Sequence, residues 1–483
     1  MPIAPAPSAT TRSLGAGARP PRRRHAPTAI LLIVCAAQFM INLDASIVNV
    51  ALPHMRQALH LTPAGQQWIV NAYTLGFAGL LLLGGRLADL VGTRRAFLGG
   101  LIVFTLASLV GGLASNGALL IGARAAQGAG GAFLAPATLT LVMTTFTEPR
   151  VRTRALGAWS AVTAGGGAAG AVLGGVLTQY VDWRWAFIVN VPLGIALLGA
   201  ALTYLPAAHG RGGGLRGLDL PGALTVTAGL TALVYGIIST ETHSWESPTV
   251  WGALATAVLL LAAFVRIETR SAAPLVPLSV FRQPSLAIAN TAGFGLGAAV
   301  IAMWFLLSLY LQQILGQGAL TAGLSCLPGC LAIVVGAQLS TRLVRRTGPR
   351  PLILTGAVLS TVGFLWLSRI SADGSYAADV LTPLVLCTLG MGLAMMPLTI
   401  AATTGTHPSQ VGLASGLIST SRQVGGAFGL AVLASIASHT TAAHGAATAQ
   451  ALTDGYGRAL LAAAAFTAAA ALTSLALPRA RTR

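Results

Sequence analysis

The chain has 483 residues, of which 54% are hydrophobic and only 8% are charged, and its mean hydropathy is +0.75. A soluble globular domain carries roughly 25% charged residues, so this composition excludes one and indicates a protein that crosses a membrane many times. The net charge of +18 does not indicate a nucleic-acid partner, because the chain has no lysine and most of its arginines lie between the hydrophobic runs.

The chain begins with a polar stretch followed by a hydrophobic run. Residues 1–27 are rich in Pro, Ala and Arg, and such a segment buries too little apolar surface to fold, so we expect a disordered cytoplasmic tail. The run at 28–52 is long enough to span a bilayer and has no convincing cleavage site, which indicates an uncleaved first helix. Asp44 lies well inside this run. An ionised side chain near the bilayer centre is costly, so Asp44 is a functional candidate by default.

Fourteen runs of this kind occur, each long enough to cross about 30 Å of hydrocarbon, and they predict an all-α polytopic membrane protein. They lie at 28–52, 67–89, 96–114, 117–143, 155–178, 186–206, 219–238, 249–266, 286–313, 320–341, 350–370, 379–402, 412–438 and 457–477. Arginine clusters fall on one side of the alternating connections, and the other side has only scattered arginines. By the positive-inside bias we expect both termini to be cytoplasmic, and the even number of helices agrees.

Three short motifs accompany these helices. The loop after the second run contains a Gly, Asp and Arg pattern, at Gly85, Asp89, Gly92, Arg94 and Arg95. The fourth run contains the sequence RAAQG, which begins at Arg124. The fifth run repeats glycine at a spacing that lets helix backbones approach closely, at Gly166, Gly170, Gly174 and Gly175.

Through these motifs, and through the segment Leu43–Pro53, the chain resembles the major facilitator superfamily and specifically its fourteen-helix drug/proton antiporters. The resemblance implies a major facilitator fold, with two six-helix bundles and two inserted transmembrane helices. It places the N-terminal bundle at 28–206, the inserted helices and their linkers at 207–283, the C-terminal bundle at 284–477 and a cytoplasmic tail at 478–483. It also implies proton-driven export of amphipathic drugs or antibiotics.

The fifth-helix motif departs from the family pattern at one position. The family normally has Pro after Gly170, and this chain has Ala171 instead. The replacement removes a site that favours a helix kink. In this family the motif is associated with export, so the effect of Ala171 on the direction of coupling stays open.

Asp44 has a predicted partner in Arg124. Asp44 lies about eight residues before the end of the first run and Arg124 about seven residues into the fourth, so at 1.5 Å per residue both lie roughly 10 to 12 Å below the same surface. A cavity that opens first to one side and then to the other can make such a carboxylate load and release a proton. The resemblance adds that the fourth-helix Arg of these antiporters is implicated in proton coupling. The alternative for both residues is a static buried ion pair.

Asp89, Arg94 and Arg95 are expected to have a different task, because they lie at a helix end on the cytoplasmic side. There an acid can pair with Arg across the loop or interact with a neighbouring helix N-terminus. We predict a latch that holds the cytoplasmic gate shut in one state, and we do not expect Asp89 to carry the proton. The alternative is a plain surface ion pair.

Polar and aromatic residues in the predicted helices form the candidate substrate-binding set. They are Asn49, Asn71, Tyr73, Trp159, Asn290, Trp304, Tyr310 and Arg422. Such a mixture suits amphipathic ligands, although ordinary helix packing is an alternative for each residue alone. The only acid in the last six runs is Asp379, which lies at the edge of one of them. The partner of Arg422 is therefore a backbone carbonyl, water or an anionic substrate group.

No cofactor is expected. The histidines and cysteines form no cluster with metal-ligand spacing, and no nucleotide-binding glycine motif with lysine is present. The driving force is therefore an ion gradient, and a single intramembrane acid suits a proton better than a metal cation. We predict a bacterial inner-membrane transporter, not an enzyme, which acts as a monomer on a small amphipathic substrate. The alternatives are a metabolite transporter on the same fold and a membrane sensor that does not transport.

Overall fold

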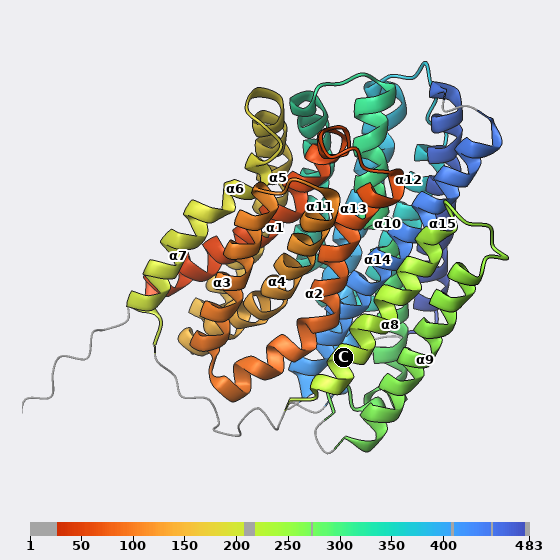
Figure 1. Cartoon of the computed structure of the whole chain (residues 1–483). Helices are drawn as coiled ribbons and strands as arrows, with labels where there is room; N and C mark the ends of the chain where they lie inside the picture. The colour runs from red at the N-terminus through yellow and green to blue at the C-terminus, as the bar shows by residue number, and fades with distance from the viewer. Residues whose placement is uncertain (1–26, 207–217, 272–273, 407–409, 446–447, 479–483) are drawn as a thin grey trace, which may run out of the picture.

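The computed structural model describes residues 27–206, 218–271, 274–406, 410–445 and 448–478, and within these ranges the regular structure is entirely helical (Figure 1). The helices of the first half are α1 (Pro27–Ala58), α2 (Pro63–Val91), α3 (Thr93–Gly112), α4 (Gly117–Thr145), α5 (Pro149–Tyr180), α6 (Trp185–Ile188), α7 (Asn190–Tyr204), α8 (Leu220–Ser239) and α9 (Pro248–Arg270). Those of the second half are α10 (Pro284–Leu309), α11 (Ala319–Thr347), α12 (Pro349–Leu367), α13 (Thr382–Thr403), α14 (Val411–Ala443) and α15 (Ala449–Ser474). The expected tail at 1–27 lies outside the described residues except for Pro27, and the tail at 478–483 lies outside them except for Pro478.

Fourteen helices in the described part of the chain are long and apolar enough to cross a membrane, which confirms the predicted number. Helices α6 and α7 together form one of these spans, Trp185–Tyr204. Two spans include a π-helical turn, at Tyr310–Ile314 after α10 and at Tyr376–Leu381 before α13. The first helix extends to Ala58, beyond the predicted end, because Pro53 does not terminate it. Neighbouring helices can support a proline inside a transmembrane helix.

The described helices pack as two bundles of six spans each, with an additional pair between them in the sequence. In the first bundle α1 packs on α5 and α2 packs on α4, and in the second α10 packs on α14 and α12 packs on α13. The two bundles meet mainly where α2 packs on α14 and α5 packs on α11. The additional helices α8 and α9 pack on each other, and α8 lies against α2 and α14 (Figure 1).

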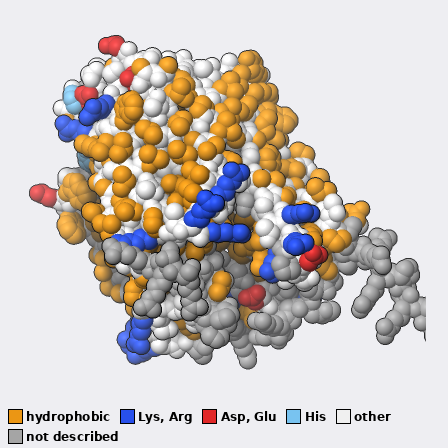
Figure 2. Space-filling view, turned by 180° about the vertical axis from the view of Figure 1, so that it is seen from behind, with side chains coloured by type: hydrophobic (Ala, Val, Ile, Leu, Met, Phe, Trp, Pro, Cys, Tyr) orange, Lys and Arg blue, Asp and Glu red, His pale blue; other side chains and the backbone are white. Residues whose placement is uncertain are grey.

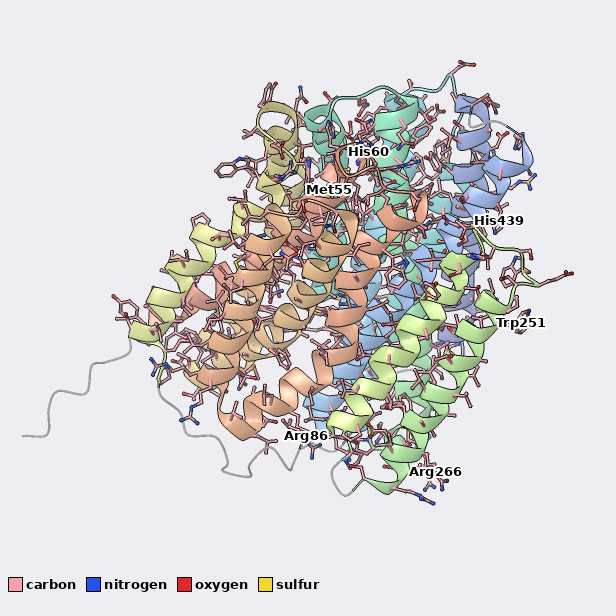
Figure 3. The ribbon with its side chains drawn as sticks, in the orientation of Figure 1. Met55, His60, Arg86, Trp251, Arg266 and His439 are labelled. Carbon is pink, nitrogen blue, oxygen red and sulfur yellow. The ribbon has the colours of Figure 1, made fainter. Side chains whose placement is uncertain are left out.

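Hydrophobic side chains cover most of the face shown in Figure 2, and basic side chains gather mainly toward its lower border. Such an apolar surface fits helices that contact lipid. Figure 3 places Arg86 and Arg266 at one end of the molecule, which we name the basic end. Met55 and His60 lie at the opposite end, which we name the far end. Odd-numbered spans of the first bundle run from the basic end to the far end.

Candidate functional site

The centre of the first bundle contains a buried ion pair. Asp44 comes from α1 and is fully buried, and Arg124 comes from α4 and is 1% exposed. The Arg124 Nη1 atom donates to the Asp44 Oδ2 atom at 2.6 Å. The structure therefore brings together the two residues that the sequence paired by depth. A buried charge pair contributes little to stability by itself, but loss of one partner leaves an uncompensated charge.

Polar groups from other helices complete the surroundings of the Asp44 carboxylate. The Oδ1 atom accepts hydrogen bonds from Asn190 Nδ2 of α7 at 2.9 Å and from Gln127 Nε2 of α4 at 3.0 Å. Gln127 also accepts from Arg124 at 2.9 Å and donates to Ser108 Oγ of α3 at 2.7 Å. The carboxylate thus sits in a connected buried network, in which each bond is strengthened by the low local dielectric.

Arg124 also connects the ion pair to α2. Its Nε atom donates to the Ile69 carbonyl oxygen at 3.1 Å, and its Cζ atom lies 4.2 Å from the centroid of the Tyr73 ring. The Phe187 ring is farther away, at 5.9 Å. Aromatic faces attract a guanidinium, most strongly where water is excluded. Tyr73, predicted as a substrate residue, is therefore part of the surroundings of the ion pair.

Two members of this network, Gln127 and Asn190, are not among the site residues that the sequence predicts. Gln127 follows Arg124 by three residues and so lies on the same helix face. Asn190 opens α7 and is fully buried, but its contact with α1 depends on how the bundle folds. Buried polar side chains at helix spacing from a charged residue are the signal that could have identified Gln127.

The gate motif lies at the basic end, where α2 meets α3. Gly92 separates the two helices and has φ +95°, a conformation that favours glycine. Asp89 is exposed and forms no ion pair with any residue in the described ranges. Arg94 instead donates to the Leu202 carbonyl oxygen of α7 at 2.6 Å, and Arg95 is exposed. The predicted latch contact is thus not made in this conformation, and its role stays a prediction. Gly85 of the same motif lies on α2 and faces Pro136.

The glycines of α5 lie where α5 crosses its neighbours. A Cβ atom at Gly170 would lie 2.6 Å from the Leu43 carbonyl oxygen of α1, and one at Gly166 would lie 2.8 Å from the Phe39 carbonyl oxygen. Gly174 faces α1 in the same way, at Ile47, whereas Gly175 faces Ala319 and Leu320 of α11. Ala171 is buried, and its carbonyl group lies against Gly323 of α11. The motif therefore joins α1 to α5 within one bundle, and it joins α5 to the other bundle near the far end.

The substrate candidates of the first bundle do not form one cluster. Asn49 donates to the Ala45 carbonyl oxygen at 3.1 Å, and its own carbonyl oxygen accepts from Ser308 of α10 at 2.7 Å. Asn71 is fully buried, and both polar atoms of its side chain have no hydrogen-bond partner among the described residues. Trp159 donates to the Thr138 hydroxyl at 3.3 Å.

In the second bundle Asn290 and Arg422 lie close together, because Asn290 Oδ1 accepts from the neighbouring Ser421 at 2.7 Å. Arg422 is half-buried, and its Nη1 atom donates to Met395 Sδ at 2.6 Å. Trp304 packs against Gly329, whereas Tyr310 is buried and donates to the Ser371 carbonyl oxygen at 2.8 Å. The hydroxyl of Tyr310 is therefore already engaged toward the far end. In the described ranges no group of three or more His, Cys, Asp or Glu residues could hold a metal ion.

The family model of the Major Facilitator Superfamily matches residues 34–430 of the sequence. The chain belongs to this superfamily. Its members are transporters, so the protein is a multi-pass membrane transporter and not an enzyme. The match confirms the resemblance that the loop and helix motifs indicated.

Two curated relatives within the superfamily are similar over most of their length. The cephamycin export protein CmcT of Amycolatopsis lactamdurans is 46% identical over 453 residues, which cover 93% of this chain and 92% of that protein. The puromycin resistance protein pur8 of Streptomyces alboniger is 41% identical and covers 86% of this chain and 82% of that protein. Among solved structures, an auto-inhibited POT family peptide transporter has a TM-score of 0.67 at 16% identity and covers 94% of this chain and 98% of that one. The structural likeness concerns the fold alone.

Proposed function

We propose that this major facilitator protein exports antibiotics or other amphipathic drugs from a bacterial cell in exchange for protons. The cephamycin export protein and the puromycin resistance protein of similar sequence support the substrate class. The observation that carries the proton coupling is the fully buried Asp44 carboxylate, which is held by Arg124, Gln127 and Asn190. A nearby guanidinium favours the ionised form of a buried carboxylate, and its separation favours the protonated form. Such a pair suits proton loading and release.

The proposed topology has the basic end in the cytoplasm. The arginine-rich connections favour this orientation, which places both termini in the cytoplasm and the far end outside the cell. We propose the divisions 28–206, 207–283 and 284–477 for the N-terminal bundle, the inserted pair with its linkers and the C-terminal bundle. The transporter is proposed to act as a monomer in the inner membrane.

In this orientation several hydrogen bonds connect the two bundles on the outer side. Ser308 and Gln312 of the α10 span donate to the Asn49 and Val50 carbonyl oxygens of α1 at 2.7 and 3.1 Å. Gln179 of α5 accepts from the Leu320 backbone N–H of α11 at 3.0 Å. These hydrogen bonds join the two bundles on the proposed outer side. Asp89 at the cytoplasmic side lacks its latch contact.

Helix packing connects the proposed proton site at Asp44 with the contact between α5 and α11. Protonation neutralises Asp44 and removes the charge that holds Arg124. Asp44 lies on α1, which packs closely on the glycines of α5, and α5 in turn contacts α11 of the other bundle. A change in the position of α1 therefore reaches the contact between α5 and α11. Alternating access needs such a two-state contact between bundles.

The proposal is tested in inverted membrane vesicles that carry a proton gradient, with puromycin and a cephamycin as the added compounds. Export activity moves compound into such vesicles and protons out, so addition of a transported compound dissipates the gradient. The same vesicles with Asp44→Asn are expected to show no dissipation. A gradient that persists after every compound in the wild-type vesicles would count against proton-coupled drug export.

A further inference from the structure

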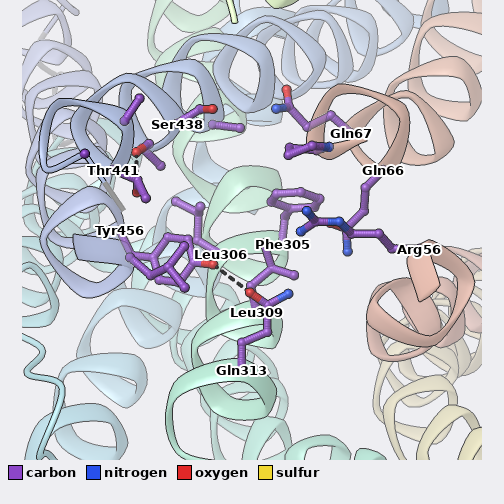
Figure 4. A pocket seen from close by; sticks show the side chains of 16 residues that line it. Arg56, Gln66, Gln67, Phe305, Leu306, Leu309, Gln313, Ser438, Thr441 and Tyr456 are labelled. Carbon is purple, nitrogen blue, oxygen red and sulfur yellow. Dashed lines mark hydrogen bonds between the residues drawn. The ribbon is translucent and has the colours of Figure 1, made fainter. Parts of the chain in front are cut away.

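The outer side of the molecule contains a cavity of about 440 Å³ between the two bundles. Figure 4 shows side chains from α1, α2, α10, α14 and α15 around it. Its polar lining includes Arg56, Gln66, Gln67, Ser438 and Tyr456, and its apolar lining includes Phe305. Sites for drug-sized ligands have volumes of about 300 to 1,000 Å³ and combine an apolar wall with a few polar groups. The cavity has the size and the lining of such a site.

Two buried amides at the start of α2 are incompletely paired. Gln66 is 1% exposed, and its Nε2 donor has no partner among the described residues. Gln67 is 2% exposed, and its Oε1 acceptor also has no partner there, although its Nε2 atom donates to the Glu241 carboxylate. Buried polar groups are normally hydrogen-bonded, and those that are not require an explanation. Both side chains line the cavity (Figure 4), so a bound molecule could supply the missing partners.

The charge of the lining selects among ligands. Arg56 is the one charged side chain among the residues that line the cavity. Its Nε atom donates to the Leu61 carbonyl oxygen at 3.3 Å, and Figure 4 shows its guanidinium group directed into the space beside Gln66. Glu241 lies behind Gln67 and does not belong to the lining. A carboxylate or carbonyl group near Arg56 is favoured, and a cation in the same place is repelled.

We propose that this outer cavity is a second binding site for the exported compound, occupied on its way out, and that it accepts a neutral or anionic amphipathic molecule. In this site Gln66 donates to the ligand and Gln67 accepts from an N–H or O–H group of the ligand. Arg56 binds a carboxylate or carbonyl oxygen, and Phe305 packs on the apolar part. The inference rests on the proposed export function, because it assumes that a compound crosses from the buried centre to this end.

The position of the cavity relative to the ion pair supports a place on the transport path. Ile69, whose carbonyl oxygen accepts from Arg124, follows Gln66 by three residues on α2. One turn of α2 therefore carries a contact of the Asp44 pair and a wall of the outer cavity. A compound in the cavity and a proton at Asp44 act on the same helix segment. Two events that act on one element can be coupled energetically.

The test measures equilibrium binding of a cephamycin, a β-lactam with a carboxylate, to the purified full-length protein in detergent. The combined variant Gln66→Met and Gln67→Met removes both amides and keeps side-chain length. We expect its affinity to fall about tenfold, as for the loss of one to two net hydrogen bonds. Gln317→Met is the matched control, because its amide lies on the outer side, accepts from Ser325 and does not line the cavity. An unchanged affinity in the combined variant would overturn the inference.

A second measurement decides the question if the combined variant does not fold. Ser438→Cys places a thiol in the cavity wall, and its labelling by a water-soluble thiol reagent is followed with and without the cephamycin. The parent protein, which retains its four native cysteines, gives the background. Protection at saturating compound supports the site, and labelling that the compound does not slow refutes it. Neither binding assay depends on export, so vesicles that show no drug-dependent proton movement count against the proposed function alone.

Discussion

Asp44→Asn is predicted to abolish proton coupling and to destabilise the first bundle. The wild-type carboxylate accepts hydrogen bonds at 2.6, 2.9 and 3.0 Å. An asparagine amide cannot balance the charge of Arg124, which is 1% exposed. Breaking a buried pair by removing one partner costs about 3 to 5 kcal/mol. Arg124 keeps its bonds to Ile69 and Gln127, so we expect the lower end of that range, about 3 kcal/mol.

The prediction separates stability from coupling through a second variant. Asp44→Asn combined with Arg124→Gln removes both charges, and it should recover most of the lost stability without restoring coupling. Thermal unfolding in detergent measures the first effect, and drug-dependent dissipation of a proton gradient in inverted vesicles measures the second. Asp182→Asn is the matched control, because its pair with Arg184 spans 3.5 Å between half-exposed side chains and should change stability by at most about 1 kcal/mol.

Two results would refute this reasoning. Transport by Asp44→Asn at the normal rate and with the normal pH dependence would remove Asp44 as the proton site. Recovery of coupling in the variant without either charge would show that the pair is a static packing contact. The second result would leave the drug-export proposal intact and would move the proton site elsewhere in the protein.

Three further predictions concern the gate, the helix contacts and the outer loop. Asp89→Asn should slow turnover while compound binding and thermal stability survive, because Asp89 is exposed and unpaired among the described residues; an unaltered transport rate would contradict a latch. Gly170→Ala should lower the free energy of unfolding by about 1 to 3 kcal/mol, because the new Cβ would meet the α1 backbone at 2.6 Å. Gly167→Ala on the same helix meets no atom within 4 Å, so it should be neutral or stabilising. Equal melting temperatures for the two variants would contradict the close packing. Burial raises the pKa of Glu241, while the hydrogen bond from Gln67 and the charge of Arg56 lower it. The ionised form is therefore disfavoured in the folded protein, so its destabilising effect is absent at low pH and develops as pH rises from the ordinary glutamate pKa through the raised one. Glu241→Gln should thus gain melting temperature relative to wild type as pH rises across that window, and a difference that does not change with pH would contradict the assignment.

The amino-acid sequence by itself determined the transmembrane architecture. In lipid each span must satisfy its own backbone hydrogen bonds, so an apolar run of sufficient length can only be a helix, and fourteen such runs became fourteen spans. The same reasoning singled out Asp44, because an acid inside an apolar run needs a reason to be there. The loop and helix motifs then identified the superfamily that the family model confirms.

The tertiary structure decided which side chains meet. The distances of Asp44 and Arg124 from the predicted helix ends indicated that they could meet, and they do. However, α1 continues to Ala58, well beyond the end that was used to estimate the depth of Asp44. Position along a helix says nothing about rotation around its axis or about its neighbours. Asn190 reaches Asp44 from 146 residues away, and Glu241 reaches Gln67 from 174 residues away. Such contacts depend on how separate helices pack, and that packing is what converts one buried acid into a candidate proton site.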